Sequence, residues 1–242
     1  MTLHRRTLLA AGASLAAPAA ALAQAAAAVD LLLVLAVDAS GSVDQVRFEL
    51  QKQGYAGALR NPRVLRAVAS GPTQSIAVCM TQWTGLGMQA RTLGWTRLSD
   101  QASLDACAGA IAASPRLLFG GGTSISGAID QGMELLRDAP YAAERRVIDI
   151  SGDGANNRGR PASLARDAAV ADGVTINGLP ILSVEPDLAE HYRNQVIGGP
   201  GAFLIATDSY ANFAEAILRK LVTEIATRVQ TPGSCAVLVT AG

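Results

Sequence analysis

The sequence predicts an α/β protein with a doubly wound, mostly parallel six-stranded sheet in three layers, α/β/α. Three observations support this fold class. Apolar runs of strand length alternate with helical patterns along most of the chain. The run at residues 31–37 is continuous and rich in Leu and Val, as expected for a parallel strand that is buried on both faces. The connection at residues 85–87 is too short for a parallel crossover, and it predicts one antiparallel edge strand.

Length and composition agree with a single α/β domain, which we assign to residues 29–229. The chain has 242 residues, of which 50% are hydrophobic and 17% are charged, so it is able to bury one large core. No internal repeat is apparent. Acidic and basic residues balance at 20 each, which argues against a nucleic acid partner.

In the first half of the domain, the sequence predicts alternating strands and helices whose ends are marked by capping and helix-breaking residues. Asn61 and Pro62 predict the end of the first helix, in which Val46 and Leu50 are among the apolar positions. Ser99 and Asp100 predict a cap for the second helix, and Ser114-Pro115 its end. The expected strands are residues 29–37, 75–83 and 88–95, and the expected helices are residues 44–60, 99–113 and 124–137.

The second half continues the alternation. The last helix repeats an apolar residue every four positions, which predicts a core-facing stripe of Phe213, Ile217, Leu221 and Ile225. Asp149 is unexpected in a buried strand, and we expect it to pair with an arginine; a supporting role at a nearby site is the alternative. The expected strands are residues 145–150, 174–179 and 202–206, and the expected helices are residues 162–172, 187–196 and 209–228.

The chain begins with a pattern typical of an export signal at residues 1–25. Arg5 and Arg6 precede an Ala-rich stretch with small residues near its end, which is typical of a twin-arginine signal. Cleavage would leave a net charge of about −2, no membrane attachment, and a periplasmic or secreted product. The alternative is an uncleaved anchor, because residues 7–29 carry no charge and are long enough to span a bilayer.

The cysteines do not form a metal-binding or redox motif. Cys79, Cys107 and Cys235 are far apart and show no Cys-x-x-Cys spacing. Cys79 lies in an apolar strand, where we expect it to be buried. A disulfide between Cys107 and Cys235 is therefore the pairing to test. We leave residues 230–242 as a tail of unassigned structure.

Asp38-Ala39-Ser40-Gly41-Ser42 follows the first strand directly and is the most informative segment. Its aspartate and two serines place hard oxygen donors at alternate positions, where one cation is able to meet all three. Taken alone, the segment is also what a turn from a strand into a helix selects, because Asp and Ser cap helices.

Two distant segments favour the cation site. Thr123 follows three glycines at the start of a helix, and Asp153 follows a strand within Ser151-Gly152-Asp153-Gly154. In a doubly wound sheet these loops enter the same edge, where ligands bind at the reversal of strand order. The predicted metal ligands are Asp38, Ser40, Ser42, Thr123 and Asp153.

This set resembles the metal-ion-dependent adhesion site of the von Willebrand factor type A (vWA) domain, and the resemblance covers residues 29–228. Segments 145–154, 177–181 and 196–201 resemble an exported bacterial group within that superfamily whose role is undefined. The resemblance implies a bound Mg²⁺, or Mn²⁺ or Ca²⁺ in its place. It also implies a protein partner that offers an exposed Asp or Glu side chain to the metal.

Two other functions remain open from the sequence. A metal-dependent hydrolase or phosphatase could use the same ion as a Lewis acid. Against it, Ser40 replaces the second carboxylate of an Asp-x-Asp phosphatase, and His191, expected at the surface, is the one histidine beyond residues 1–25. The other alternative is a metal that only stabilises the fold. We expect a binding domain with no catalytic residues.

Overall fold

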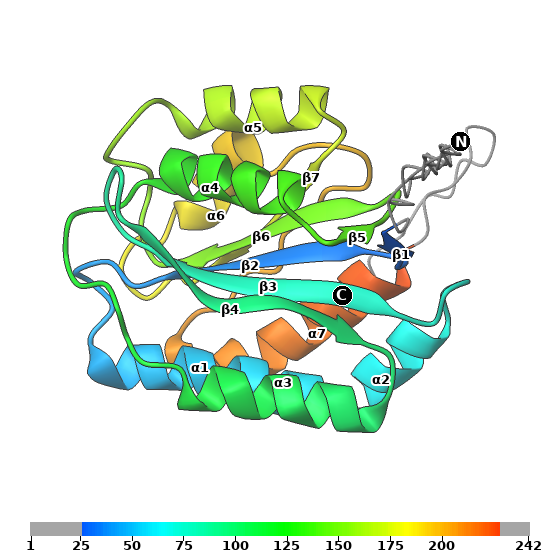
Figure 1. Ribbon diagram of the computed structural model, residues 1–242. Helices are drawn as coiled ribbons and strands as arrows, with labels where there is room; N and C mark the ends of the chain where they lie inside the picture. The colour runs from blue at the N-terminus through cyan, green and yellow to red at the C-terminus, as the bar shows by residue number, and fades with distance from the viewer. Residues whose placement is uncertain (1–25, 228–242) are drawn as a thin grey trace, which may run out of the picture.

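The computed structural model describes residues 26–227, which form a sheet between two layers of helices (Figure 1). The five-stranded sheet has the order β4-β3-β2-β6-β7, and β4 is its antiparallel edge strand. The chain therefore leaves β2 toward one edge and returns to fill the other side, which confirms the doubly wound, mostly parallel fold. The strands are β2 (Leu32–Asp38), β3 (Ile76–Trp83), β4 (Gln89–Leu98), β6 (Arg146–Gly152) and β7 (Thr175–Pro180).

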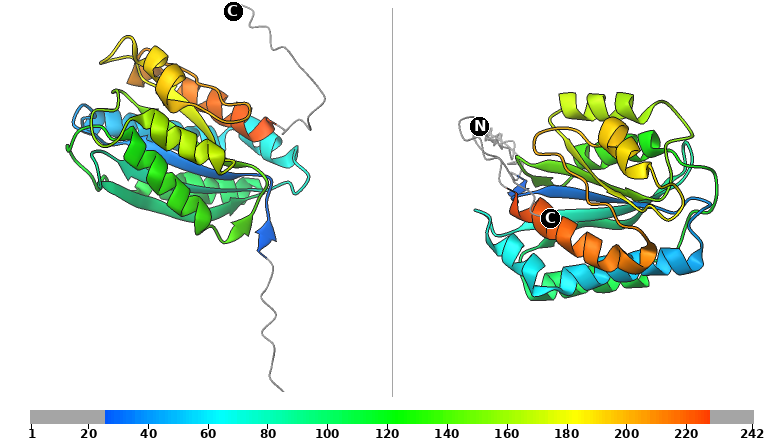
Figure 2. Two further views of the ribbon diagram at one scale, coloured as in Figure 1. Left: turned by 90° about the horizontal axis from the view of Figure 1, so that it is seen from above. Right: turned by 180° about the vertical axis from the view of Figure 1, so that it is seen from behind.

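Helices cover both faces of this sheet (Figure 1). On one face lie α1 (Gln45–Arg60), α2 (Pro62–Ala69), α3 (Gln101–Ala113) and α7 (Phe213–Ala226). On the other lie α4 (Ile125–Arg137), α5 (Ala162–Ala171) and the short α6 (Leu188–His191), which continues into a π-helical turn, Tyr192–Val196. Seen from behind, α7 runs beside α1 and α2 (Figure 2).

The central strand β2 is buried on both faces, as its continuous apolar sequence predicts. Leu33 and Leu35 point into the core shared with α1, α3 and α7, whereas Leu32 and Val34 point into the core shared with α4 and α5. The predicted stripe of α7 is buried in the first of these cores. Cys79 is also fully buried, as expected.

The predicted sixth strand at residues 202–206 forms only isolated bridges beside β7. The N–H of Gly178 donates to Phe203 O, and the carbonyl of Gly178 accepts from the N–H of Ile205. These two hydrogen bonds form a parallel bridge between Gly178 and Leu204. The next donor in a parallel ladder would be the backbone of residue 180, but that residue is Pro180 and lacks an N–H. Ladder pairing is therefore interrupted, and the sheet has five strands in place of six. A separate two-stranded parallel sheet joins β1 (Ala27–Ala28) to β5 (Tyr141–Ala142).

The predicted end of the first helix is confirmed, but the positions of two of its apolar residues differ from the expected pattern. Asn61 and Pro62 end α1, and they also begin α2, because the Asn61 side chain accepts from the N–H of Arg63 and proline suits the first helical position. Val46 and Leu50 are exposed, because α1 turns Phe48, Tyr55 and neighbouring residues toward the core.

Asp149 pairs with a lysine, and not with the arginine we expected. Lys220 Nζ on α7 lies 2.6 Å from Asp149 Oδ1 on β6 and 2.5 Å from Glu224 Oε1, and all three side chains are buried. Asn177 donates to Glu224 Oε1 at 2.9 Å. Two carboxylates thus share one ammonium. The pKa of Asp149 is raised to about 7, because burial and the neighbouring Glu224 raise it and outweigh the opposing effect of Lys220.

Several predictions fall outside the described residues. These are the export signal at residues 1–25, the tail at residues 230–242, the last turn to Arg228, and Cys235 with its proposed bridge to the buried Cys107. Within residues 26–227, no helix combines the length and the apolar character needed to span a bilayer.

Candidate metal centre

The first loop of the candidate site begins where β2 ends. Asp38 is fully buried because the whole strand is covered on both faces. Its Oδ1 accepts a hydrogen bond of 2.7 Å from the N–H of Ser40, which folds the loop back over the carboxylate. Asp44 then caps α1 by accepting from the N–H of Arg47 at 2.8 Å. The strand, the turn and the cap together hold the loop in place.

Asp153 meets this loop at the end of β6, the strand beside β2. The hydroxyl of Ser42 donates to Asp153 Oδ1 at 2.5 Å, and the hydroxyls of Ser40 and Ser42 lie 3.2 Å apart. The N–H of Asp153 donates to Asp38 Oδ2 at 3.4 Å. Four of the five predicted ligands therefore form one connected cluster.

Thr123 lies beside this cluster, facing Gly154. Its Oγ1 would be 3.4 Å from a Cβ placed on Gly154. The preceding Gly120, Gly121 and Gly122 have φ angles of +68°, +86° and +86°, a conformation that suits glycine. This glycine loop also touches the first loop, because Gly120 Cα would lie 3.8 Å from a Cβ on Gly41. The three predicted segments thus converge at one edge of the sheet.

Arg47 and Tyr210 also belong to the site, although no pattern in the sequence singles them out. Tyr210, one turn before α7, donates to Asp153 Oδ2 at 2.9 Å. Arg47 Nη1 lies 3.6 Å from the same oxygen and donates to Ser42 O at 2.7 Å. The Arg47 guanidinium also lies over the Tyr210 ring, 5.5 Å from its centre.

His191 is not the surface residue that we expected. It is half-buried, and its Nε2 accepts a hydrogen bond of 3.3 Å from the N–H of Asn156, in the loop that follows Asp153. Burial lowers the pKa of His191, and the nearby Glu185 opposes that shift. Glu185 itself accepts from the N–H of Ala155 at 3.1 Å. Both side chains hold the Asp153 loop by its backbone.

The charges of the cluster fit a divalent cation. The pKa of Asp38 is raised to about 7, because burial and the neighbouring Asp153 raise it and outweigh the hydrogen bonds from Ser40 that lower it. Asp38 and Asp153 are both fully buried, and Arg47 is partly exposed. Among residues 26–227, no group of three or more His, Cys, Asp or Glu is placed to hold a metal. A cation would therefore depend on hydroxyl oxygens, which suit hard ions such as Mg²⁺.

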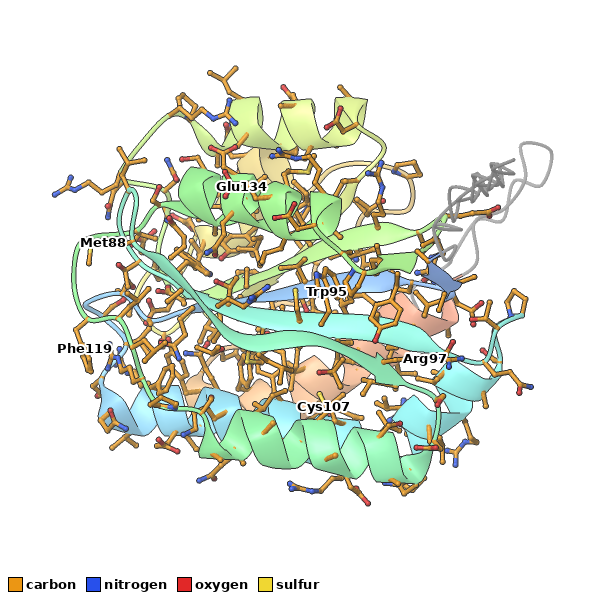
Figure 3. The ribbon with its side chains drawn as sticks, in the orientation of Figure 1. Met88, Trp95, Arg97, Cys107, Phe119 and Glu134 are labelled. Carbon is orange, nitrogen blue, oxygen red and sulfur yellow. The ribbon has the colours of Figure 1, made fainter. Side chains whose placement is uncertain are left out.

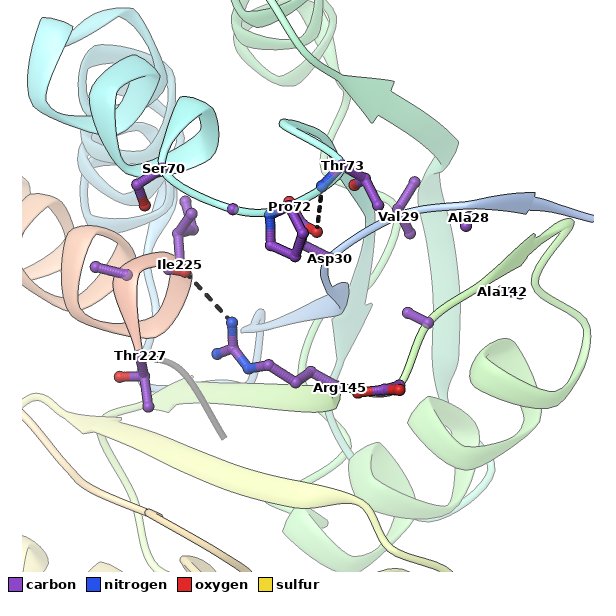
Figure 4. Close-up of a pocket in the computed structure, with 14 residues that line it drawn as sticks. Ala28, Val29, Asp30, Ser70, Pro72, Thr73, Ala142, Arg145, Ile225 and Thr227 are labelled. Atoms are coloured by element: carbon purple, nitrogen blue, oxygen red, sulfur yellow. Dashed lines mark hydrogen bonds between the residues drawn. The ribbon is translucent and has the colours of Figure 1, made fainter. Parts of the chain in front are cut away.

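A separate cavity of about 870 Å³ opens at the opposite edge of the sheet (Figure 4). It lies at the starting ends of β2 and β6, whereas the candidate metal centre lies at their finishing ends. Asp30 accepts from the N–H of Thr73 at 2.8 Å on one side, and Arg145 donates to Ile225 O at 3.3 Å on the other. None of the predicted metal ligands lines this cavity.

A family model described as "Protein of unknown function (DUF1194)" matches residues 28–229. A comparison with curated proteins found no match.

Solved structures of vWA domains share the fold. A von Willebrand factor type A protein from Catenulispora acidiphila is 19% identical, with a TM-score of 0.57 over 81% of this chain and 43% of that chain. Proximal thread matrix protein 1 from the mussel byssus, with a zinc-occupied MIDAS motif, is 16% identical, with a TM-score of 0.55 over 81% of this chain and 45% of that chain.

The pilus adhesin SpaC from Lactobacillus rhamnosus GG, in its open conformation, is 16% identical, with a TM-score of 0.57 over 82% of this chain and 30% of that chain. The chain therefore spans less than half the length of these three structures. At such identities the likeness establishes the fold alone, and it is the fold that the vWA resemblance of the sequence implies.

Proposed function

The chain belongs to the DUF1194 family, and we propose that it is an exported vWA domain that binds a protein partner through a divalent metal ion. The observation that carries the proposal is the cluster of Asp38, Ser40, Ser42 and Asp153, with Thr123 beside it. Three loops far apart in the sequence supply these oxygens at one edge of the sheet. The vWA fold of the neighbours and the MIDAS motif named for one of them support this proposal.

The five predicted ligands would hold Mg²⁺, or Mn²⁺ or Ca²⁺ in its place. When bound, the ion supplies an electrophilic centre for a carboxylate oxygen of the partner. Three of the five ligands are hydroxyls without formal charge, and we propose that the two aspartates bind the ion through water, so that the ion remains electrophilic toward a carboxylate from outside. The two carboxylates already accept hydrogen bonds from Ser40, Ser42 and Tyr210, which orient them.

Thr123 is the ligand that follows the glycine loop. Three successive residues of this loop have positive φ, and the Thr123 backbone exchanges hydrogen bonds with the Asn157 segment, whereas the first loop is fixed by side chains of Arg47, Gln51 and Arg116. We propose that Thr123 approaches the ion when a partner carboxylate binds. The partner is accordingly a protein with an exposed Asp or Glu, and the place of binding is the periplasm or the cell exterior, as the twin-arginine pattern at residues 1–25 favours.

A binding function fits this site better than hydrolysis does. His191 is the histidine nearest to the Asp153 loop, but its Nε2 accepts from a backbone N–H, so it is occupied as a general base. Asp38 and Asp153 orient one another and the serines, and the Ser42 hydroxyl that donates to Asp153 is itself one of the predicted metal ligands. We therefore propose a domain without catalytic residues.

Short displayed peptides test the proposal. Two libraries with randomised flanks, one with a fixed central Asp and one with a fixed central Asn, are panned on the protein in Mg²⁺ and in EDTA. We expect retention of the Asp library in Mg²⁺ only, and loss of this preference in Asp153→Ala. Equal retention of the Asp and Asn libraries, or equal retention in EDTA, would exclude carboxylate capture. Calorimetric titration with Mg²⁺ alone separates that result from a metal that serves only stability.

A further inference from the structure

Large apolar side chains are exposed around the candidate metal centre. Five of the seven exposed large hydrophobic residues in the described part of the chain lie on segments that enter this edge of the sheet. We call these five residues the apolar rim. They are Val46 (69% exposed), Leu86 (67%), Leu117 (48%), Phe119 (63%) and Val184 (47%). Single exposed apolar residues are common on protein surfaces, but their concentration around one site points to an interface.

The rim lies next to the metal ligands. Phe119 directly precedes Gly120, whose Cα would be 3.8 Å from a Cβ placed on Gly41 of the first loop. Leu86, at the tip of the β3-β4 hairpin, has its Cδ1 3.3 Å from the Cβ position of Gly159 in the loop after Asp153. Met88 directly precedes β4, close to the tip of the same hairpin. Met88 and Phe119 appear at the same end of the molecule (Figure 3).

The segment that carries Leu117 and Phe119 is firmly anchored, so these side chains are not exposed by a loose loop. The buried Gln82 donates to Pro115 O at 2.8 Å and accepts from the N–H of Leu117 at 2.8 Å. Arg116 donates to Leu118 O at 3.0 Å and to Ala39 O at 3.0 Å, beside the metal ligands. The backbone is thus held on both sides while the apolar side chains point outward.

Positive charge accompanies the apolar side chains. The Arg116 guanidinium lies over the Phe119 ring, 4.7 Å from its centre. Within residues 26–227, neither Arg116 nor the exposed Arg158 makes an ion pair with a carboxylate. Arg158 packs against the glycine loop, because its Cγ would be 2.8 Å from a Cβ on Gly122. The edge therefore offers two unpaired guanidinium groups around the predicted cation.

We propose that the apolar rim and its arginines form a docking surface for an acidic protein segment in which large apolar residues flank the captured Asp or Glu. This inference rests on the proposed metal-dependent function and adds the chemistry of the partner. The carboxylate meets the ion, an aromatic or large aliphatic residue packs on Leu117 and Phe119, and further acidic groups face Arg116 and Arg158. Arg116 holds Phe119 and the first loop together, which links apolar contact to the metal ligands.

The peptides retained in the two libraries test this proposal once they are sequenced. In the Asp library we expect enrichment of large apolar residues close to the fixed Asp. The double variant Leu117→Ser/Phe119→Ser should lose that enrichment and bind the selected peptides about tenfold more weakly, because apolar contact area is removed from the complex. Leu164→Ser is the matched control, because Leu164 is 55% exposed on α5, which covers the opposite face of the sheet from α3, the helix that leads to Leu117 and Phe119.

The possible failures are distinguishable. Retention of the Asp library without apolar enrichment, or unchanged binding by the double variant, would overturn the docking surface and leave metal-dependent capture intact. Failure to prefer Asp over Asn would overturn the proposed function. Calorimetric Mg²⁺ titration of the double variant must give the wild-type affinity, because a loss there would assign both side chains to the metal site and overturn their role in partner contact.

Discussion

The hydroxyl of Tyr210 donates a hydrogen bond of 2.9 Å to Oδ2 of Asp153, the carboxylate whose Oδ1 accepts from Ser42. Burial and the neighbouring Asp153 both raise the pKa of Tyr210, so its hydroxyl keeps its proton and remains a donor. Tyr210 therefore fixes the orientation of a predicted metal-site carboxylate from the segment that leads into α7.

Tyr210→Phe is expected to weaken Mg²⁺ binding while the fold is retained. Partners that orient metal ligands commonly contribute about tenfold or more to metal affinity, so we expect at least about a tenfold rise in the calorimetric Kd. Tyr141→Phe, on β5 at the other edge of the sheet, is the control. An unchanged Kd in Tyr210→Phe would show that Asp153 is oriented without this hydroxyl.

Asp38→Asn should separate the metal contribution from the intrinsic stability of the fold. In EDTA above about pH 8 the variant lacks a buried charge, so we expect a melting temperature equal to or above that of the wild type. In Mg²⁺ at about one hundred times Kd, the unfolding free energy of the wild type should rise by about 2.7 kcal/mol, whereas that of the variant should not change. Thermal unfolding in both conditions measures this difference. Stabilisation of the variant by Mg²⁺ would contradict the role of Asp38.

The buried group of Asp149, Lys220 and Glu224 predicts a pH dependence of stability. The pKa of Asp149 rises from 3.8 to about 7 in the folded protein, so the folded state binds this proton more tightly than the unfolded state. Its contribution is therefore fully present below about pH 4 and is lost as the pH rises through about 7. We expect denaturant unfolding in EDTA to show greater stability at about pH 5.5 than at about pH 8.

Asp149→Asn should reduce this slope, and the exposed Asp105→Asn should not. Asp38, whose pKa is also raised to about 7, contributes in the same direction, so part of the slope remains in Asp149→Asn. Identical pH profiles for the wild type and Asp149→Asn would mean that Asp149 stays ionised beside Lys220 over the whole range.

Gly85→Ala should disturb the glycine loop that precedes Thr123. A Cβ on Gly85 would lie 2.1 Å from Gly121 O, a backbone atom that is able to move away only with its loop. We expect a loss of about 1–3 kcal/mol in unfolding free energy and weaker Mg²⁺ binding. Gly94→Ala is the matched control, because nothing lies within 4 Å of its Cβ position. Equal Mg²⁺ affinity in the two variants would place Thr123 outside the binding site.

The parts of the fold that the sequence predicts are those with strong local signals. The continuous apolar run of β2, the short β3-β4 connection and the capped α3 are each determined by nearby residues. Asp38 and Asp153 could be placed together because parallel strands finish at the same edge of a sheet.

The contacts that the sequence does not reveal join residues without a shared pattern. Lys220 on α7 pairs with Asp149 on β6 because the fold brings these two elements together. The apolar stripe of α7 shows only which apolar residues face the core, and it does not reveal this ion pair. Tyr210 reaches Asp153 for a similar reason. Pro180 is visible in the sequence, but its effect on the strand at residues 202–206 depends on the pairing of β7. Asn61-Pro62 is ambiguous, because the same pair ends one helix and starts another.

The position of the two described ends has a practical consequence. Ala28 near one end and Thr227 at the other both line the cavity at the edge opposite the candidate metal centre (Figure 4). Both described ends of the domain therefore lie on the side opposite the loops of the candidate metal centre. A support placed against residues 26–28 or 227 would leave these loops facing a partner that arrives from solution.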